Sequence, residues 1–451
     1  MNVNDMALYL SQPRFTEAHG AAVSEFLRRP EEIDWKLFLF QVKYHRTYPL
    51  VHRNVSRHVG FDKLPARVAK LLTMLRHKLL LRNERNREHI AAVLAALNSA
   101  GIEPTIWKGA FLFEAVYPCI DMREFADVDL IIDLEEYGAA KASLAGIGYS
   151  PFRTRAYEET VLRSDFGEIE FRNPDRLSVD IHWELSQAMM FHITNTYSYR
   201  AIKKRSVPAE YLGARVRFMS PEDILMSSAI HLSCKHFFGM FVYYLDLYYT
   251  IEKYGSGIDW DRLVKEAGRR KLSKLMYYVL HYLTRSVGPD SIKPHVEKLK
   301  RFPEIPGERR WFESVASPAA CISYNPSHEF ELAGKNKKIG AMKQAFRLLS
   351  GKEISGELEE FFQGYVVGFD RWYLSQIALT EKPADRLRLV ARYAFPGAVD
   401  LSLLYMNYER WIDPLALSLI HFCAVTVYQN PAGIRRWMQA AGSRRGEAAP
   451  A

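Results

Sequence analysis

The chain contains little cysteine and no long apolar run. Its four cysteines, at positions 119, 234, 321 and 423, are far apart and form no Cys-x-x-Cys pair. Neither a disulfide framework nor a zinc knuckle is therefore predicted, and a reducing cytoplasm is the expected location. The most apolar late segment, residues 415–428, contains His421 and is too short to cross a bilayer, so we expect no membrane insertion. The N-terminus has no basic head before an apolar core, and no secretory leader is predicted.

Several sequence patterns of common enzymes are also missing. Residues 106–133 hold the densest combination of Gly, Lys and spaced carboxylates in the sequence. Around them the chain has no GxxxxGK[ST] loop, no HExxH helix and no GxSxG elbow, which disfavours P-loop ATPase, metalloprotease and esterase chemistry. The 61 Lys and Arg residues exceed the 52 Asp and Glu residues, which gives a net charge of +9. This balance favours anionic partners. Because the excess is small for a chain of this length, nucleotides are favoured over nucleic acid.

The hydrophobic content of 48% in 451 residues supports a large buried core divided among two or three domains. The periodicities predict an α+β fold that is mostly helical, with a small mixed sheet over roughly residues 102–200. The expected division is an N-terminal helical region (1–100), an α/β core (101–215), a helical region packed on the core (216–290), a C-terminal helical region (291–441) and a disordered tail (442–451).

Apolar residues at spacings of three and four predict the helices. A long amphipathic helix is expected from about residue 66 to 100, ending at Gly101. Ser220 is expected to cap a helix whose first position is Pro221. Further helices are predicted at 224–238, 243–254, 261–269, 272–287, 337–349, 357–377 and beyond residue 384.

The period changes between residues 102 and 145. Residues 102–107 and 126–132 are predicted as strands, and 110–116 and 134–145 as helices, which makes a β-α-β-α unit. Alternation along the second strand places Asp127 and Asp129 on one face. Two adjacent carboxylates repel each other, and Mg²⁺ is a common solution because it prefers oxygen ligands. The alternative is a solvated or Lys- and Arg-paired Asp pair at a strand edge.

A third carboxylate is available in the strand predicted at residues 177–185. Asp180, His182 and Glu184 share one face of that strand. His182 is suited to orienting a ligand or assisting proton transfer, although a core histidine is an equal alternative. Glu168 and Glu170 form a second alternating pair, and Glu170 is kept as a substitute for Asp180 if the strand order differs.

The turn before the first predicted helix offers groups for phosphate. Gly109 allows phosphate to approach the backbone at a helix N-terminus, and Lys108 can meet its charge. Arg123 is either a phosphate-binding residue or a salt-bridge partner of Asp121 or Glu124.

The segment AIHLSCKHFF contains three potential metal ligands, His231, Cys234 and His236. Positions 231 and 236 differ by five and do not share a face well on an α-helix, so zinc is not expected there. Core histidines beside aromatic residues are the simpler interpretation, with Lys235 able to reach the cleft.

Taken together, the Lys-Gly turn, the Arg123 loop with its DVDLII strand and the VDIHWEL strand resemble the uncharacterised nucleotidyltransferase-like family of the DNA polymerase β superfamily. The similarity extends from the helices near Asp34, through GIEPTIWKG, to SPEDILMSSAIHLSCKH and LDLYYTIEKYGSGIDWDRL. Two differences from the family pattern concern the residues expected to bind phosphate. Ala110 stands where a small hydroxyl residue commonly follows the turn glycine, and the separation between Gly109 and Asp127 is longer than in minimal members.

The resemblance implies a nucleotidyltransferase core and a set of roles. Asp127, Asp129 and Asp180 would be the catalytic metal ligands for Mg²⁺ (or Mn²⁺), with Asp180 helping to deprotonate the attacking hydroxyl. Lys108, Gly109 and Arg123 would bind the nucleotide, and His182 and Glu170 are possible auxiliaries. The implied reaction transfers a nucleoside monophosphate from an NTP, ATP among them, to an unidentified hydroxyl acceptor: a small molecule, a protein or RNA. The alternative is a catalytically inactive nucleotide-binding or protein-interaction scaffold of the same fold.

Overall fold

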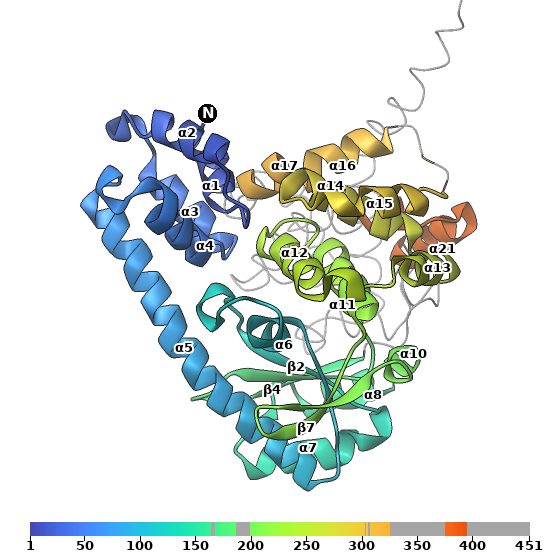
Figure 1. The fold of residues 1–451 in the computed structure, drawn as a ribbon. Helices are drawn as coiled ribbons and strands as arrows, with labels where there is room; N and C mark the ends of the chain where they lie inside the picture. Colours follow the sequence, from blue (N-terminus) through green and yellow to red (C-terminus); the bar gives the residue numbers. More distant parts are fainter. Residues whose placement is uncertain (164–166, 186–198, 303, 305–306, 325–374, 395–451) are drawn as a thin grey trace, which may run out of the picture.

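A seven-stranded mixed sheet forms one end of the molecule, and helices make up most of the rest (Figure 1). The computed structural model describes residues 1–163, 167–185, 199–302, 304, 307–324 and 375–394. The predicted α+β, mostly helical fold is confirmed. Outside the described residues lie the helix predicted at 337–349, most of that at 357–377, the apolar segment 415–428 and the tail 442–451.

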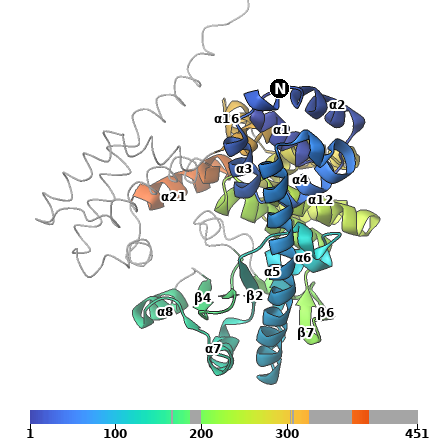
Figure 2. The same ribbon diagram turned by 90° about the vertical axis from the view of Figure 1, so that its left-hand side faces the viewer.

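The N-terminal region consists of helices that lead to one long helix, α5. They are α1 (Val3–Leu10), α2 (Glu17–Phe26), α3 (Trp35–Tyr44), α4 (Tyr48–Asn54) and α5 (Ala66–Ser99). With 34 residues, α5 spans about 50 Å. It ends as predicted at Gly101, whose φ of +79° suits a glycine after a helix C-terminus. The helix runs from the other N-terminal helices to the sheet along one edge of the molecule (Figures 1 and 2).

Basic side chains of α5 fix the segment that precedes the second strand. Three of them form ion pairs with acidic side chains between residues 114 and 124. The pairs are Arg76–Asp121 (2.6 Å), Arg82–Glu124 (3.1 Å) and Arg87–Glu114 (2.8 Å). The amide of Asn83, buried in the same helix, donates to the carbonyls of Ile120 and Arg123. The long helix therefore serves as a support for the loop that enters the sheet.

The sheet has the strand order β3-β4-β5-β2-β1-β7-β6. The strands are β1 (Thr105–Trp107), β2 (Asp127–Ile131), β3 (Ser150–Pro151), β4 (Glu168–Arg172), β5 (Ser178–His182), β6 (Val207–Tyr211) and β7 (Ala214–Phe218). Strands β2 and β5 are parallel, whereas β1 and β4 are antiparallel to their central neighbours. The register aligns Asp129 with Asp180, and it aligns His182 with Glu168 on the next strand.

The sheet extends further along the chain than the range of residues 102–200 expected from the sequence. The hairpin β6–β7 adds two strands at one edge, where Thr105 of β1 pairs with Arg217. Its turn residues, Leu212 and Gly213, both have positive φ (51° and 76°), as a two-residue turn of type I′ requires. Leucine is an unusual residue at such a turn, and this explains why the sequence did not signal the hairpin.

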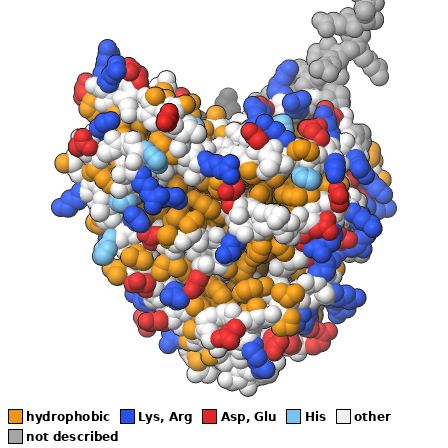
Figure 3. Space-filling view, in the orientation of Figure 1, with side chains coloured by type: hydrophobic (Ala, Val, Ile, Leu, Met, Phe, Trp, Pro, Cys, Tyr) orange, Lys and Arg blue, Asp and Glu red, His pale blue; other side chains and the backbone are white. Residues whose placement is uncertain are grey.

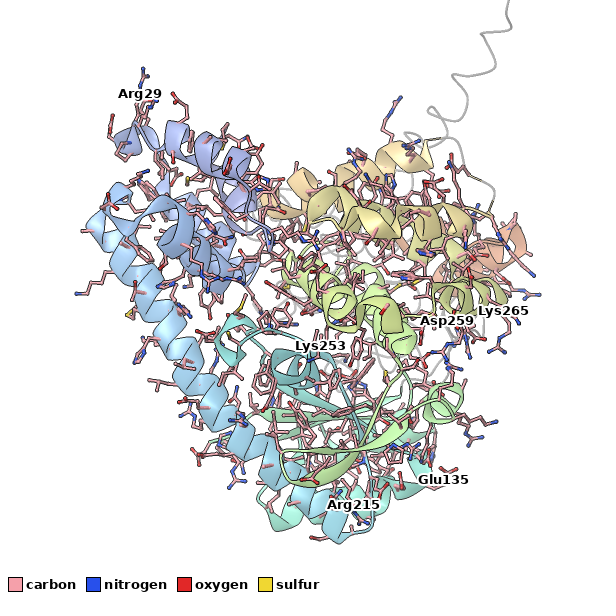
Figure 4. All side chains as sticks on the ribbon, viewed as in Figure 1. Arg29, Glu135, Arg215, Lys253, Asp259 and Lys265 are labelled. Carbon is pink, nitrogen blue, oxygen red and sulfur yellow. The ribbon has the colours of Figure 1, made fainter. Side chains whose placement is uncertain are left out.

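Shorter helices flank the sheet, and a larger helical layer lies above it in the view of Figure 1. The helices that flank the sheet are α6 (Lys108–Ala115), α7 (Tyr137–Gly146), α8 (Arg155–Leu162) and α10 (Tyr199–Lys203). The layer contains α11 (Pro221–Ile230), α12 (Val242–Tyr254), α13 (Trp260–Arg269), α14 (Ser273–Ser286), α15 (Lys293–Leu299), α16 (Glu308–Ala316), α17 (Pro318–Ser323) and α21 (Pro383–Ala394). Helices α11 and α12 lie between the sheet and α14 (Figure 1). In Figure 4, Arg29 and Arg215 mark opposite ends of the molecule along α5.

The helix predicted at residues 224–238 is interrupted. It begins as expected, with the Ser220 hydroxyl accepting from the amide of Asp223, but after Ile230 it becomes a π-helix over His231–Lys235. One π turn brings residues five apart onto the same face, so Nε2 of His231 and Nε2 of His236 lie 3.2 Å apart. The expectation that these histidines would not face each other was therefore wrong.

Other expectations can be compared with the described residues. Cys119, Cys234 and Cys321 are free thiols. None of the helices described has both the length and the apolar character needed to span a membrane. Helices predicted at 243–254, 261–269 and 272–287 correspond to α12, α13 and α14.

Candidate functional site

Acidic side chains of two parallel strands meet at the centre of the sheet. Asp127 and Asp129 lie on β2, and Asp180 and His182 lie on β5, as the alternation of the two strands predicts. One ligand atom each from Asp129, Asp180 and His182 can be chosen so that all three atoms lie within 4.8 Å of one another. A single ion with ligand bonds of about 2.1–2.4 Å spans such a group.

Asp129 is the best-connected carboxylate of this group. Its Oδ1 accepts from Lys108 and lies 2.9 Å from Nε2 of His182, and the residue is only 2% exposed. Lys108 begins α6 with a φ of 51°, a conformation that is uncommon for a residue with a side chain. Its ammonium group also lies 4.2 Å from the ring centroid of Trp107. The predicted Lys-Gly turn thus places a cation directly on the second aspartate.

His182 joins Asp129 to a further acid, Glu168 of β4. Nδ1 of His182 lies 3.4 Å from Oε2 of Glu168, and the imidazole is 3% exposed. Nζ of Lys235, from the π-helix, lies 4.0 Å from the same Glu168 oxygen. A chain of alternating acidic and basic groups therefore crosses the site, in the order Asp129, His182, Glu168 and Lys235.

Glu170, the predicted substitute for Asp180, is not part of this chain. It aligns with Asp180 in the sheet, but its Oε1 accepts from Nε of Arg172 at 2.6 Å. The role of Glu168 depends on the antiparallel register of β4 and β5, and the sequence alone does not give this register. Glu184, predicted on the same face as His182, lies beyond the end of β5.

Asp180 supplies a buried oxygen that is available to a ligand. The residue is 7% exposed, and its Oδ1 is buried without a hydrogen-bond partner among the described residues. A buried carboxylate oxygen in this condition is costly unless a cation or donor satisfies it. The donor set of two carboxylates and one imidazole, together with this unsatisfied oxygen, fits a divalent metal ion.

The electrostatics of the group follow from its burial and its excess of acids. Burial, together with the charges of Asp129 and Glu168, raises the pKa of Asp180 to about 9. Burial and the nearby Asp129 raise the pKa of Asp127 to about 6. Burial acts in the same direction on Asp129, but Lys108 and the hydrogen bond with His182 outweigh it and hold the pKa of Asp129 below its usual value. A divalent cation would favour the ionised form of all three aspartates.

Gly109 is required by the packing of α6 against the loop before β2. A Cβ atom at this position would lie 2.6 Å from Cβ of Phe125, in the loop before β2. Ala110 is fully buried, and its carbonyl accepts from the hydroxyl of Tyr211 at 2.7 Å. The glycine therefore lets the first turn of α6 lie directly against the loop that leads to Asp127.

Arg123 is held in a structural ion pair. Its Nε and Nη2 donate to the two carboxylate oxygens of Asp246 on α12, at 2.7 and 2.8 Å, and the Arg123 side chain is 3% exposed. Its partner is therefore neither Asp121 nor the Glu124 carboxylate, the two salt-bridge partners considered from the sequence. The Arg123 guanidinium donates to Asp246 and also to the carbonyl of Glu124, and its nucleotide-binding role stays a prediction.

A mixed sheet that carries converging carboxylates on adjacent parallel strands defines a protein with a candidate metal centre on an α/β core. The sequence profile of the family described as "Uncharacterised nucleotidyltransferase" matches residues 31–288, more than half of the chain. The chain belongs to this family, which confirms the resemblance and supports a transferase activity. Comparison with curated proteins and with solved structures found no match.

Proposed function

We propose that the protein is a metal-dependent nucleotidyltransferase that transfers a nucleoside monophosphate from an NTP to a hydroxyl group of an acceptor. The observation that carries this proposal is the convergence of Asp129, Asp180 and His182 around an unsatisfied oxygen of Asp180, in a chain of this family. The acceptor class, a small molecule, a protein or RNA, is left to experiment.

The proposed metal ligands are Asp127, Asp129 and Asp180. Divalent ions such as Mg²⁺ or Mn²⁺ neutralise a triphosphate and align it for in-line displacement when they are bound at such a site. The acidic residues alone would repel an NTP, so their charges must be offset before it can bind. Lys108 already offsets part of the charge of Asp129, and we assign to it, with Gly109, the first contacts with phosphate.

The chemical step follows from the assigned groups. The acceptor oxygen forms a bond to the α-phosphorus, and the bond from that phosphorus to the bridging oxygen breaks, so that pyrophosphate leaves. The proton of the attacking hydroxyl passes to Asp180, which a bound divalent cation would keep ionised and therefore able to accept it. Asp129, fixed by Lys108 and His182, keeps the reacting groups in place.

The decisive experiment measures nucleotide binding with and without divalent metal. The double variant Asp127→Asn/Asp129→Asn should lose the metal-dependent part of NTP binding, and transfer of label from an α-labelled NTP should fall by at least 100-fold. Glu135→Gln is a suitable control because this side chain is 73% exposed and lies at the periphery of the molecule (Figure 4).

If NTP binding and transfer are the same in the wild type and the double variant for every nucleotide, the catalytic proposal fails. The inactive scaffold would then be the better description. Small molecules, proteins and RNA, tested separately as recipients of label in the wild type, would identify the acceptor class.

A further inference from the structure

His182 lies where it can serve the site as a nitrogen ligand. Its Nε2 faces Oδ1 of Asp129 at 2.9 Å, and the ring belongs to the group that also contains Asp180. Neighbouring ligands of an octahedral ion with bonds of about 2.1 Å are about 3.0 Å apart. The separation of Nε2 from the Asp129 oxygen is that of a hydrogen bond while Nε2 carries the proton, and it also matches two ligands of one ion when the proton is on Nδ1.

The opposite side of the ring has the partner that a metal-bound histidine needs. A histidine that ligates through Nε2 carries its proton on Nδ1, and this N–H is usually held by a carboxylate or carbonyl. Here Nδ1 faces Oε2 of Glu168 at 3.4 Å, and Glu168 itself lies near Lys235. Trp107 packs against the ring in a T-shaped arrangement, with centroids 5.3 Å apart. Asp129 and Glu168 thus lie at the two different nitrogen atoms of the same imidazole.

A nitrogen ligand changes which metal the site prefers. Mg²⁺ demands oxygen ligands in a nearly ideal octahedron, whereas imidazole is a better ligand for first-row transition ions. Mn²⁺ is the weakest-binding ion of the first-row series, so a preference for Mn²⁺ over Mg²⁺ is a conservative measure of this effect.

We propose that Nε2 of His182 ligates the metal ion together with Asp129 and Asp180, that Glu168 fixes the imidazole for this purpose, and that the site therefore prefers a first-row transition ion to Mg²⁺. This inference rests on the proposed function, because it concerns the metal site of the same reaction. Glu168 is a positioning residue: it acts through His182 and does not contact the ion.

The test uses the full chain and Mn²⁺ alone as the probe. Mn²⁺ binding is titrated by electron paramagnetic resonance, Mg²⁺ affinity is obtained by competition, and pulsed measurements record coupling of the bound Mn²⁺ to nitrogen. Protein labelled with ¹⁵N-histidine should show the ¹⁵N frequencies in place of those of ¹⁴N. This measurement needs no variant, so it holds even if a substitution at position 182 prevents folding.

Variants then test whether the coupled nitrogen belongs to His182 and whether Glu168 holds the imidazole in place. His182→Gln should abolish the nitrogen coupling and reduce the ratio of Mn²⁺ to Mg²⁺ affinity on the order of tenfold. Glu168→Gln should keep the coupling but weaken Mn²⁺ binding by about 10- to 100-fold, the usual effect of removing such a partner. Glu170→Gln is the matched control, because it removes a similar charge from β4 at a residue paired with Arg172. Its Mn²⁺ affinity should equal that of the wild type.

The outcomes separate this inference from the proposed function. Mn²⁺ that binds only when Asp129 is present, but without coupling to histidine nitrogen, would overturn the role of His182 and leave the nucleotidyltransferase proposal standing. Nitrogen coupling that survives in His182→Gln would also overturn it, and would place the ion near another histidine. Mn²⁺ binding that is insensitive to Asp129→Asn would overturn both.

Discussion

The packing of one residue, Gly109, affects where the strand with Asp127 and Asp129 begins. Its backbone lies close to Phe125, two residues before Asp127, and a Cβ at position 109 would be 2.6 Å from Cβ of Phe125. Because Gly109 lies within α6 and has no positive φ, alanine would otherwise be favourable there. The close approach of Phe125 to the backbone therefore explains why position 109 is a glycine.

Gly109→Ala should lower the free energy of unfolding by about 1–3 kcal/mol, because the loop before β2 must move away from α6. Gly138→Ala is the control: this glycine also lies in the first turn of a helix, and its Cβ would meet nothing within 4 Å. That variant should be unchanged or more stable by up to about 1 kcal/mol. Denaturant unfolding measures both. Equal effects of the two substitutions would show that contact with Phe125 is unimportant.

At the residue scale, strand alternation predicts which candidate side chains share a face of their strand. It put Asp127 with Asp129, and Asp180 with His182, and the structure brings Asp129, Asp180 and His182 together. The sequence does not show which of Glu168 and Glu170 lies next to the other candidate site residues. It depends on which residue of β4 aligns with His182, and on the local pairing of Glu170 with Arg172.

At the scale of elements, the long periodic helices were predictable and the local irregularities were not. Helix α5 has a clear apolar stripe and a glycine after its end, so its limits agree with the prediction within one residue. The π-helix at His231–Lys235 has no comparable signal, because periodicity assumes α-helical geometry throughout. The Leu212-Gly213 turn was missed since its composition is unusual for a two-residue hairpin.

The junction between α3 and α4 is held by a buried histidine. The amide of Phe241, next to α12, donates to Nδ1 of His45 at 3.3 Å. Nδ1 is therefore the acceptor, and Nε2 donates to the carbonyl of Ile322 in α17 at 3.0 Å. The ring is fully buried, and burial lowers the pKa of His45 to about 3. One neutral imidazole thus connects the N-terminal helices with α12 and α17.

Protonation of His45 should destabilise the fold. Between about pH 6.5 and pH 3 the unfolded chain binds a proton at this residue and the native protein does not. Stability therefore falls as pH is lowered through this window, and His45 contributes at most about 1.4 kcal/mol per pH unit. His45→Gln should be less stable at pH 7 but should lose stability less steeply. Unfolding measured from pH 7 to pH 5 would test this, and parallel curves would contradict it.

At the scale of the whole molecule, the net charge of +9 indicates little about which ligand the protein binds. Figure 3 shows Lys and Arg side chains interspersed with Asp and Glu over the face in view, without separation of the two signs. Many of the charged groups are paired within the structure, including those that join α5 to residues 114–124. A nucleotide substrate is therefore supported by the site and by the family, and only weakly by the composition of the chain.

A buried ion pair joins the loop before β2 to the helical layer above the sheet. Both oxygens of Asp246 on α12 accept from Arg123, which lies just before β2, and the Tyr117 hydroxyl donates to Oδ1 at 2.7 Å. Both charged side chains are at most 4% exposed. A buried guanidinium that loses its charged partner is strongly unfavourable, whereas removal of both charges is tolerated much better.

Asp246→Asn should therefore reduce the free energy of unfolding by about 3–5 kcal/mol, and the double variant Arg123→Met/Asp246→Leu should recover much of that loss. The same double variant distinguishes the two roles considered for Arg123. If the arginine only joins the layers, the folded double variant should bind NTP in the presence of metal within a few-fold of the wild type. If it folds with wild-type stability but binds NTP at least tenfold more weakly, Arg123 contacts the nucleotide, and its pairing with Asp246 serves to position it for that contact.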